Sequence, residues 1–181
     1  MLSFGAWRRR NLVIVRRERN GSVEPLPHHS EAISTRRRDV EQKIDALSAD
    51  DVARVEKQRA WVRDHYDAAA RHEYETVEGK LRLLDTIVRS KWIEPSETWK
   101  LQSLGIAFGD ALAQKMGLIW VAVEDTHGRD PALRDQGTSI VLFPMTTISK
   151  RIERGETVDV RALFDAACHS VVRLRDDLRG R

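Results

Sequence analysis

The most regular apolar pattern in this chain lies near its C-terminus. Large apolar residues recur there every three or four positions, at Val160, Leu163, Phe164, Ala167, Val171, Leu174 and Leu178. This spacing gives a helix one continuous apolar face, and Asp159 stands before it as an N-cap. We therefore predict an amphipathic helix here, whose burial stabilises the fold by about 1.5–3 kcal/mol for each large side chain.

Two more apolar stripes predict helices in the middle of the chain. The first follows Thr76 and repeats at Val77, Leu81, Leu84 and Val88. The second covers about residues 97–116 and contains Gly105 and Gly109, which share one side of the helix. Two interior glycines lower helix propensity by about 2 kcal/mol together. We expect another backbone to pack closely against the glycine side, which would offset this cost.

Alternating apolar residues predict two strands, at residues 119–124 and 139–143. Both faces of the first strand are apolar until Glu124, which favours a central position in a sheet. A charged loop joins the strands, and Asp130-Pro131 is typical of the start of a turn. Pro144 ends the second strand, and a short helix is expected after it.

Residues 31–72 carry two apolar stripes that predict a helical hairpin. Its first helix starts after Ser30, and its second is capped by Ser48 and has an apolar stripe that reaches Ala69. Arg59 interrupts that stripe, and we expect its charged head to lie in water.

Residues 1–30 are predicted to be a basic arm. Asn20-Gly21 is a hairpin signal that would join residues 12–15 to residues 22–26. A lone hairpin is only marginally stable in water, and Pro25 and Pro27 disfavour the second strand. We therefore expect a loosely held arm.

Together these elements predict an α+β fold, in which a small antiparallel sheet of at least two strands is packed by several amphipathic helices. Residues 73–181 would form the body, and the arm and the helical hairpin would join it in one domain, as expected for 181 residues. No apolar run approaches the ~18 residues of a membrane span, and no signal-peptide pattern is present. With one cysteine, Cys168, the chain is predicted to be cytoplasmic.

The positive charge is concentrated at the start of the chain. The net charge is +3, but residues 1–38 contain nine Arg and three Glu, so the remainder is net acidic. The basic character is therefore weak support for a nucleic-acid-binding fold. Contacts between the arm and phosphates stay open beside a solubilising role.

Charged residues with functional potential gather around the two strands. They are Glu124, Asp125, His127, Arg129, Asp130, Arg134, Lys150 and Arg151. One interpretation is a pocket for acid–base chemistry or anion binding. The other, which we favour, is structural: Arg129 or Arg134 pairs with a carboxylate at the end of the first strand. A buried carboxylate needs a partner, and a guanidinium suits bidentate pairing.

No catalytic motif is present, so no catalytic residue is assigned. Glu124 and Asp125 are neighbours on a strand and point to opposite faces, which argues against the carboxylate pair of a glycosidase. Cys168 and His169 diverge by about 100° on a helix. The histidines share no ligand spacing with acidic residues or cysteine, so no metal site is expected. Phosphate-binding glycine motifs are absent, and no cofactor is expected.

Several separated motifs occur in an informative order. They are WKLQSLGIAFGDAL, WVAVEDTHGRDPALR, GTSIVLFPMTTISKRIERGE and VDVRALFD. They resemble a bacterial family of small domains of unknown function, over about residues 76–174. The resemblance implies a bacterial origin and one compact domain, supplies no catalytic residue, and leaves residues 1–38 outside.

These observations favour a non-enzymatic protein-binding module, in an adaptor or immunity-like role. The expected surface is the loop after Asp125 together with the helix that carries Lys150 and Arg151. The main alternative is a hydrolase or an anion-substrate enzyme that uses carboxylates of residues 124–135. A third is nucleic-acid binding through residues 1–38. No membrane contact is expected, and the oligomeric state stays open.

Overall fold

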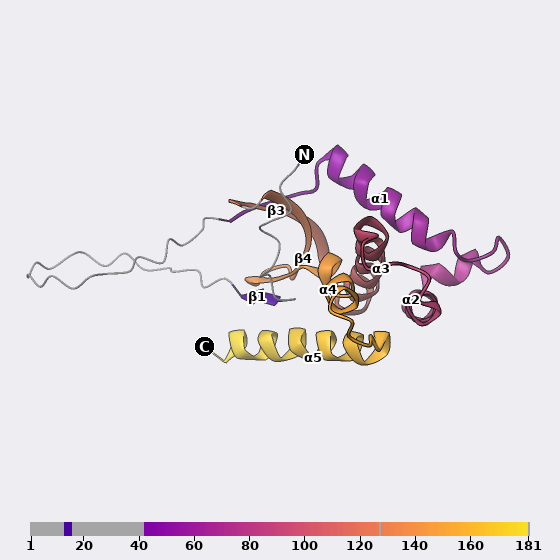
Figure 1. Cartoon of the computed structure of the whole chain (residues 1–181). Helices are drawn as coiled ribbons and strands as arrows, with labels where there is room; N and C mark the ends of the chain where they lie inside the picture. Colours follow the sequence, from indigo (N-terminus) through magenta and orange to yellow (C-terminus); the bar gives the residue numbers. More distant parts are fainter. Residues whose placement is uncertain (1–12, 16–41, 127, 181) are drawn as a thin grey trace, which may run out of the picture.

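The computed structural model describes residues 13–15, 42–126 and 128–180 (Figure 1). Within these ranges the chain has an α+β fold, as predicted. Its strands are β1 (Val13–Val15), β2 (Lys43–Asp45), β3 (Ile119–Asp125), β4 (Gly128–Arg134) and β5 (Ile140–Leu142). Its helices are α1 (Ala49–Arg63), η1 (Arg71–Glu75), α2 (Val77–Ser90), α3 (Thr98–Met116), η2 (Pro144–Thr146), α4 (Ser149–Glu153) and α5 (Val160–Arg179).

The five described strands form one antiparallel sheet in the order β1-β5-β4-β3-β2. β3 lies between β4 and β2, which confirms its predicted central position. The prediction of a charged loop between the two predicted strands is wrong. Most of that segment is β4, which pairs with β3 along its whole length. The predicted strands are therefore not neighbours, because β4 separates them.

The predicted turn at Asp130-Pro131 is also wrong, since both residues lie inside β4. Proline cannot donate to a ladder, so it is tolerated where a strand has an unpaired edge. β4 pairs with β5 only at Leu133 and Arg134, and Pro131 lies beyond that ladder, opposite Ala122 of β3. One-sided pairing makes room for a proline in the middle of this strand.

The segment before α1 differs from the predicted helical hairpin. Lys43–Asp45 form an edge strand rather than the end of a helix, and Ile44 pairs with Val123. Ile44 packs against the apolar cluster around Val123. The apolar residues of this segment do not show by themselves that it pairs as a strand with β3. Val13–Val15 pair with β5 at the other edge. The Asn20-Gly21 turn, residues 22–26 and the helix start at Ser30 lie outside the described residues.

The N-caps predicted at Ser48 and Asp159 are confirmed. Ser48 and Asp51 form a reciprocal capping box at the start of α1. Thr76 caps α2, Asp159 caps α5, and Gly117 ends α3 in the left-handed region at φ 68°. The apolar stripe of α1 is shorter than predicted, because the helix ends at Arg63 and Ala69 lies beyond it.

α3 lies at the centre of the fold, between the sheet and helices α1 and α2 (Figure 1). A Cβ at Gly105 would collide with the backbone of Met145, and one at Gly109 would lie 2.7 Å from the Trp120 ring. The predicted close approach is therefore confirmed, and its partner is η2. Phe108 meets Phe164 of α5 edge to face at 6.0 Å, which joins the last helix to the same core.

Candidate functional site

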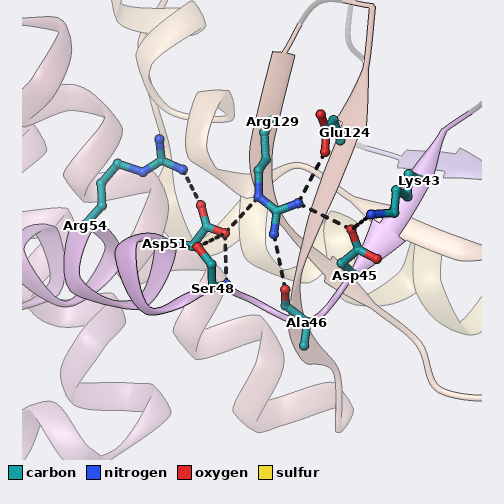
Figure 2. A network of polar contacts seen from close by, with 8 residues as sticks. All are labelled: Lys43, Asp45, Ala46, Ser48, Asp51, Arg54, Glu124 and Arg129. Carbon is teal, nitrogen blue, oxygen red and sulfur yellow. Dashed lines mark hydrogen bonds and ion pairs between the residues drawn. The ribbon is translucent and has the colours of Figure 1, made fainter.

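Arg129, on β4, is the hub of a polar network at the junction of the sheet and α1 (Figure 2). Its Nε donates to Asp51 Oδ2 at 3.0 Å. Its Nη1 lies 3.5 Å from a carboxylate oxygen of Asp45 and 3.5 Å from one of Glu124. Its Nη2 donates to the Ala46 carbonyl oxygen at 3.3 Å. The predicted pairing of Arg129 with Glu124 is confirmed. The closer partner, Asp51, was not predicted.

The sheet register explains why these charges meet. Lys43, Glu124 and Arg129 occupy directly opposed positions on three adjacent strands, so their side chains share one face. Asp45 lies two residues after Lys43 on the same face and forms an ion pair with it at 2.9 Å. Local alternation thus aligns four charges, and the start of α1 adds Asp51.

Four donors from three residues surround the Asp51 carboxylate, and one of them is the Ser48 hydroxyl, which donates to Oδ2 at 2.9 Å. Its Oδ2 accepts the Ser48 N–H at 3.0 Å, and its Oδ1 accepts from Arg54 at 3.1 Å, in addition to the bond from Arg129. Burial disfavours the charged form of this side chain, which is 8% exposed, but hydrogen bonds from Ser48 and Arg129 outweigh that effect and lower its pKa. The pKa of Asp45 is lowered chiefly by its hydrogen bond from Lys43. Both carboxylates suit stable ion pairing.

Two further ion pairs connect distant elements. Asp135, just after β4, receives a bidentate pair from Arg175 of α5, with Nη2–Oδ1 at 2.5 Å and Nε–Oδ2 at 3.1 Å. The hydrogen bond from Arg175 lowers the pKa of Asp135. Arg59 makes a similar pair with Asp110, with Nε–Oδ2 at 2.6 Å, so the prediction that its head lies in water was wrong. Asp110 lies on α3 and faces α1, and it also accepts a hydrogen bond from the Trp120 indole at 2.9 Å.

The structure brings only some of the predicted site residues together. Glu124 and Asp125 end β3 and Arg129 and Asp130 begin β4, so these four meet at the tip of the hairpin. His127 lies outside the described residues. The remaining predicted residues lie elsewhere: Arg134, Lys150 and Arg151.

Arg134 stands opposite Ile119 at the far end of the hairpin, about 17 Å along the strand from Arg129 at about 3.4 Å per residue. Lys150 and Arg151 lie on α4, which packs against α3 and η2. Arg151 donates to the Thr147 carbonyl oxygen at 2.7 Å. The predicted surface is therefore divided between the hairpin tip, its far end and α4.

A surface that was not predicted lies on α1, the connection before α3, and the first turn of α3. It consists of Trp61, His65, Trp92 and Trp99, and we call it the tryptophan surface. The ring of Trp61 is 5.6 Å from that of Trp99 and 6.1 Å from that of Trp92, between centroids. His65 stacks on Trp92 at 5.5 Å. Trp92 is 43% exposed and Trp99 40%.

One signal for this surface was available in the sequence. Trp61 and Trp99 stand outside the apolar stripes that predict α1 and α3, and Trp92 falls in a connection between helices. Large aromatic residues that no predicted core face uses are candidates for contacts with a partner. Their mutual contact depends on the tertiary packing of α1 against α3.

Within residues 42–126 and 128–180, no group of three His, Cys, Asp or Glu side chains is arranged to hold a metal ion. None of the described helices is long and apolar enough to cross a membrane.

Residues 80–164 match a family model described as "Domain of unknown function (DUF3806)". The fold is also similar to a crystal structure of a protein from Bacteroides thetaiotaomicron VPI-5482, with a TM-score of 0.58 and 16% sequence identity over 70% of this chain. The match covers 47% of that protein, so this chain spans about half of its length, and at this identity the likeness concerns the fold alone. No curated protein matches the chain. The resemblance of the sequence motifs to a bacterial family of unknown function is thus confirmed, and the model that residues 80–164 match is that of DUF3806.

Proposed function

We propose that this chain is a non-enzymatic protein-binding module and that it contacts its partner through the tryptophan surface. The observation that carries the proposal is the exposure of two neighbouring tryptophans, 43% at Trp92 and 40% at Trp99. Tryptophan is enriched at the energetic centres of protein interfaces. Among the described residues, the other large apolar side chains that are exposed belong to three different elements: Val52 to α1, Ile119 to β3 and Val172 to α5. Scattered apolar residues are ordinary on a protein surface.

The tryptophan surface is also suited to binding because its rings hold one another in place. Trp61 contacts three rings, those of His65, Trp92 and Trp99. A side chain already fixed in the free protein loses little rotamer freedom when a partner arrives, which lowers the entropic cost of association. An adaptor or immunity-like role fits such a preorganised surface.

The hairpin tip has a different role in this proposal. The guanidinium of Arg129 donates to Asp51 and to the Ala46 carbonyl oxygen, so its hydrogen bonds stabilise the junction of the sheet and α1. The lowered pKa values of Asp45, Asp51 and Asp135 suit ion pairing, whereas a general acid at neutral pH needs a raised pKa. We therefore assign the network a structural role rather than an enzymatic one.

The test is an affinity capture from the bacterium that makes the protein, with three baits: the full chain, its W92A/W99A variant and an I119A/V172A control. The control removes exposed apolar side chains elsewhere. We expect a partner retained by the full chain and the control but lost from W92A/W99A. Once purified, that partner should bind W92A/W99A at least about tenfold more weakly, as expected for interface tryptophans. Equal binding to all three proteins would refute the proposal.

A further inference from the structure

We infer that the segment which docks on the tryptophan surface is acidic and carries a large apolar side chain. This inference rests on the proposed function and adds the chemistry of the partner. It follows from the cations that border the rings, from the way in which the nearby carboxylates are used, and from the angles between the rings.

Two lysines lie against the exposed tryptophans. The Lys57 ammonium is 5.9 Å from the centroid of the Trp99 ring, and the Lys100 ammonium is 5.2 Å from that of Trp92. Lys57 is exposed on α1. In the part of the chain that the structure describes, no carboxylate lies within ion-pair distance of Lys57, so its charge is available to a partner. An apolar contact bordered by available positive charge is complementary to an acidic segment.

The acidic side chain closest in sequence to Trp99, that of Glu97, is already engaged. Glu97 forms an ion pair with Lys100, and it also accepts the Glu94 N–H at 2.9 Å. These hydrogen bonds, that from Lys100 foremost, lower the pKa of Glu97. Its negative charge is therefore compensated within the protein and does not balance Lys57. The acidic residues of the partner are expected next to Lys57 and Trp99.

The ring geometry favours a protein segment over single-stranded nucleic acid. Successive bases bind by stacking on open, suitably aligned aromatic faces. Here Trp61 meets Trp99 at 70° and Trp92 at 56°, and the stacked pair, His65 on Trp92, uses one of the available faces. Lysine ammoniums lie over the rings of Trp92 and Trp99. Ring edges and partly covered faces suit an aliphatic or aromatic side chain better than a row of bases.

The experiment selects a random decapeptide library, displayed on phage, against the immobilised full chain. Parallel selections use W92A/W99A and the I119A/V172A control. Preserved circular dichroism and thermal unfolding show that each variant is folded. We expect the full chain and the control to enrich peptides with several Asp or Glu around a large apolar residue, and W92A/W99A to lose this enrichment.

Charge is then tested with a synthetic peptide from the selection. Its Kd is measured by fluorescence anisotropy for the full chain, K57E and K115E. Lys115 is a matched exposed lysine on α3, about 24 Å along the helix from Trp99 at about 1.5 Å per residue. We expect K57E to weaken binding about tenfold and K115E less than about twofold, with the difference shrinking as salt is raised.

Each other outcome identifies what is wrong. Peptides that need the tryptophans but show no acidic excess, or an affinity unchanged by K57E, overturn this inference and leave the proposed function standing. No tryptophan-dependent peptide at all overturns both. Binding of a fluorescent oligothymidylate that is lost in W92A/W99A would overturn the acidic partner in favour of nucleic acid.

Discussion

The Arg129 network and the tryptophan surface use their residues in opposite ways. In the network, the charged side chains turn toward one another, and the carboxylate of Asp51, a side chain that is 8% exposed, accepts hydrogen bonds from four donors. On the tryptophan surface, apolar rings are left 40–43% exposed to solvent. The charged groups of the network are paired within the protein, whereas the tryptophan rings still expose apolar area that a partner could bury.

The difference favours the tryptophan surface over the charged hairpin as the proposed partner-binding surface. The sequence directs attention to the charged hairpin because opposed charges gather there. Once folded, those charges contribute to stability through ion pairs and a helix cap, which satisfies a buried carboxylate. The apolar area of exposed tryptophans, in contrast, is in unfavourable contact with water in the isolated protein. Covering it with a partner would lower the free energy.

The largest expected effect is on stability, from Asp51→Ala. The change removes the half of the α1 capping box in which the Asp51 carboxylate accepts the Ser48 N–H, together with the main partner of Arg129. We expect a loss of about 2–3 kcal/mol in the free energy of unfolding: about 1 for the cap and the rest for the ion pair, reduced for solvent screening. Urea unfolding measures it, and peptide binding by the tryptophan surface should be unchanged.

Asp51→Asn is the matched control, because the amide oxygen of asparagine can still accept the Ser48 N–H at position N3 but carries no charge to pair with arginine. It should recover the cap contribution of about 1 kcal/mol. If Asp51→Asn is as unstable as Asp51→Ala, the ion pair rather than the cap carries the whole effect.

A smaller effect on stability, with a larger one on binding, is expected from Trp99→Ala. Trp99 is 40% exposed and packs against Trp61. Its partial burial should be worth about 1 kcal/mol of stability, while affinity for the partner falls at least about tenfold. Chemical denaturation and anisotropy on the same samples separate the two. If Trp99→Ala lowers stability strongly but binds the partner normally, then Trp99 is a structural residue like Asp51 and not a binding residue.

The smallest expected effect is a change in acid sensitivity. The folded-state pKa values of Asp45, Asp51 and Asp135 are lowered. Their contribution to stability is therefore complete above about pH 4, the ordinary aspartate range, and is lost as pH falls through the lower folded-state values. Urea midpoints measured between neutral and acidic pH should show this decrease.

Arg129→Ala should make that decrease shallower, because it removes one of the hydrogen-bond donors to both Asp45 and Asp51. Some decrease should remain, because Ser48, Lys43 and Arg175 still stabilise the charged carboxylates. An identical pH profile in the variant would mean that Arg129 does not affect these titrations.

Features that depend on nearby residues could be predicted from the sequence. The stripes of α2, α3 and α5, the caps at Ser48 and Asp159, and the α+β class required only patterns two to four residues apart. The glycine pair of α3 predicted a close neighbour, and the structure supplied its identity, the backbone around Met145.

Only the tertiary structure decided which elements became strands and which charges met. β2 is three residues long and exists because β3 pairs with it, and β4 contains a proline that local rules assign to a turn. Arg129 and Asp51 are 78 residues apart, and Asp135 and Arg175 are 40 apart. Local propensity determines where helices begin and end because their bonds are local. Strand pairing, ion pairs and the exposure of Trp92 and Trp99 depend on packing between distant segments, which no short stretch of sequence encodes.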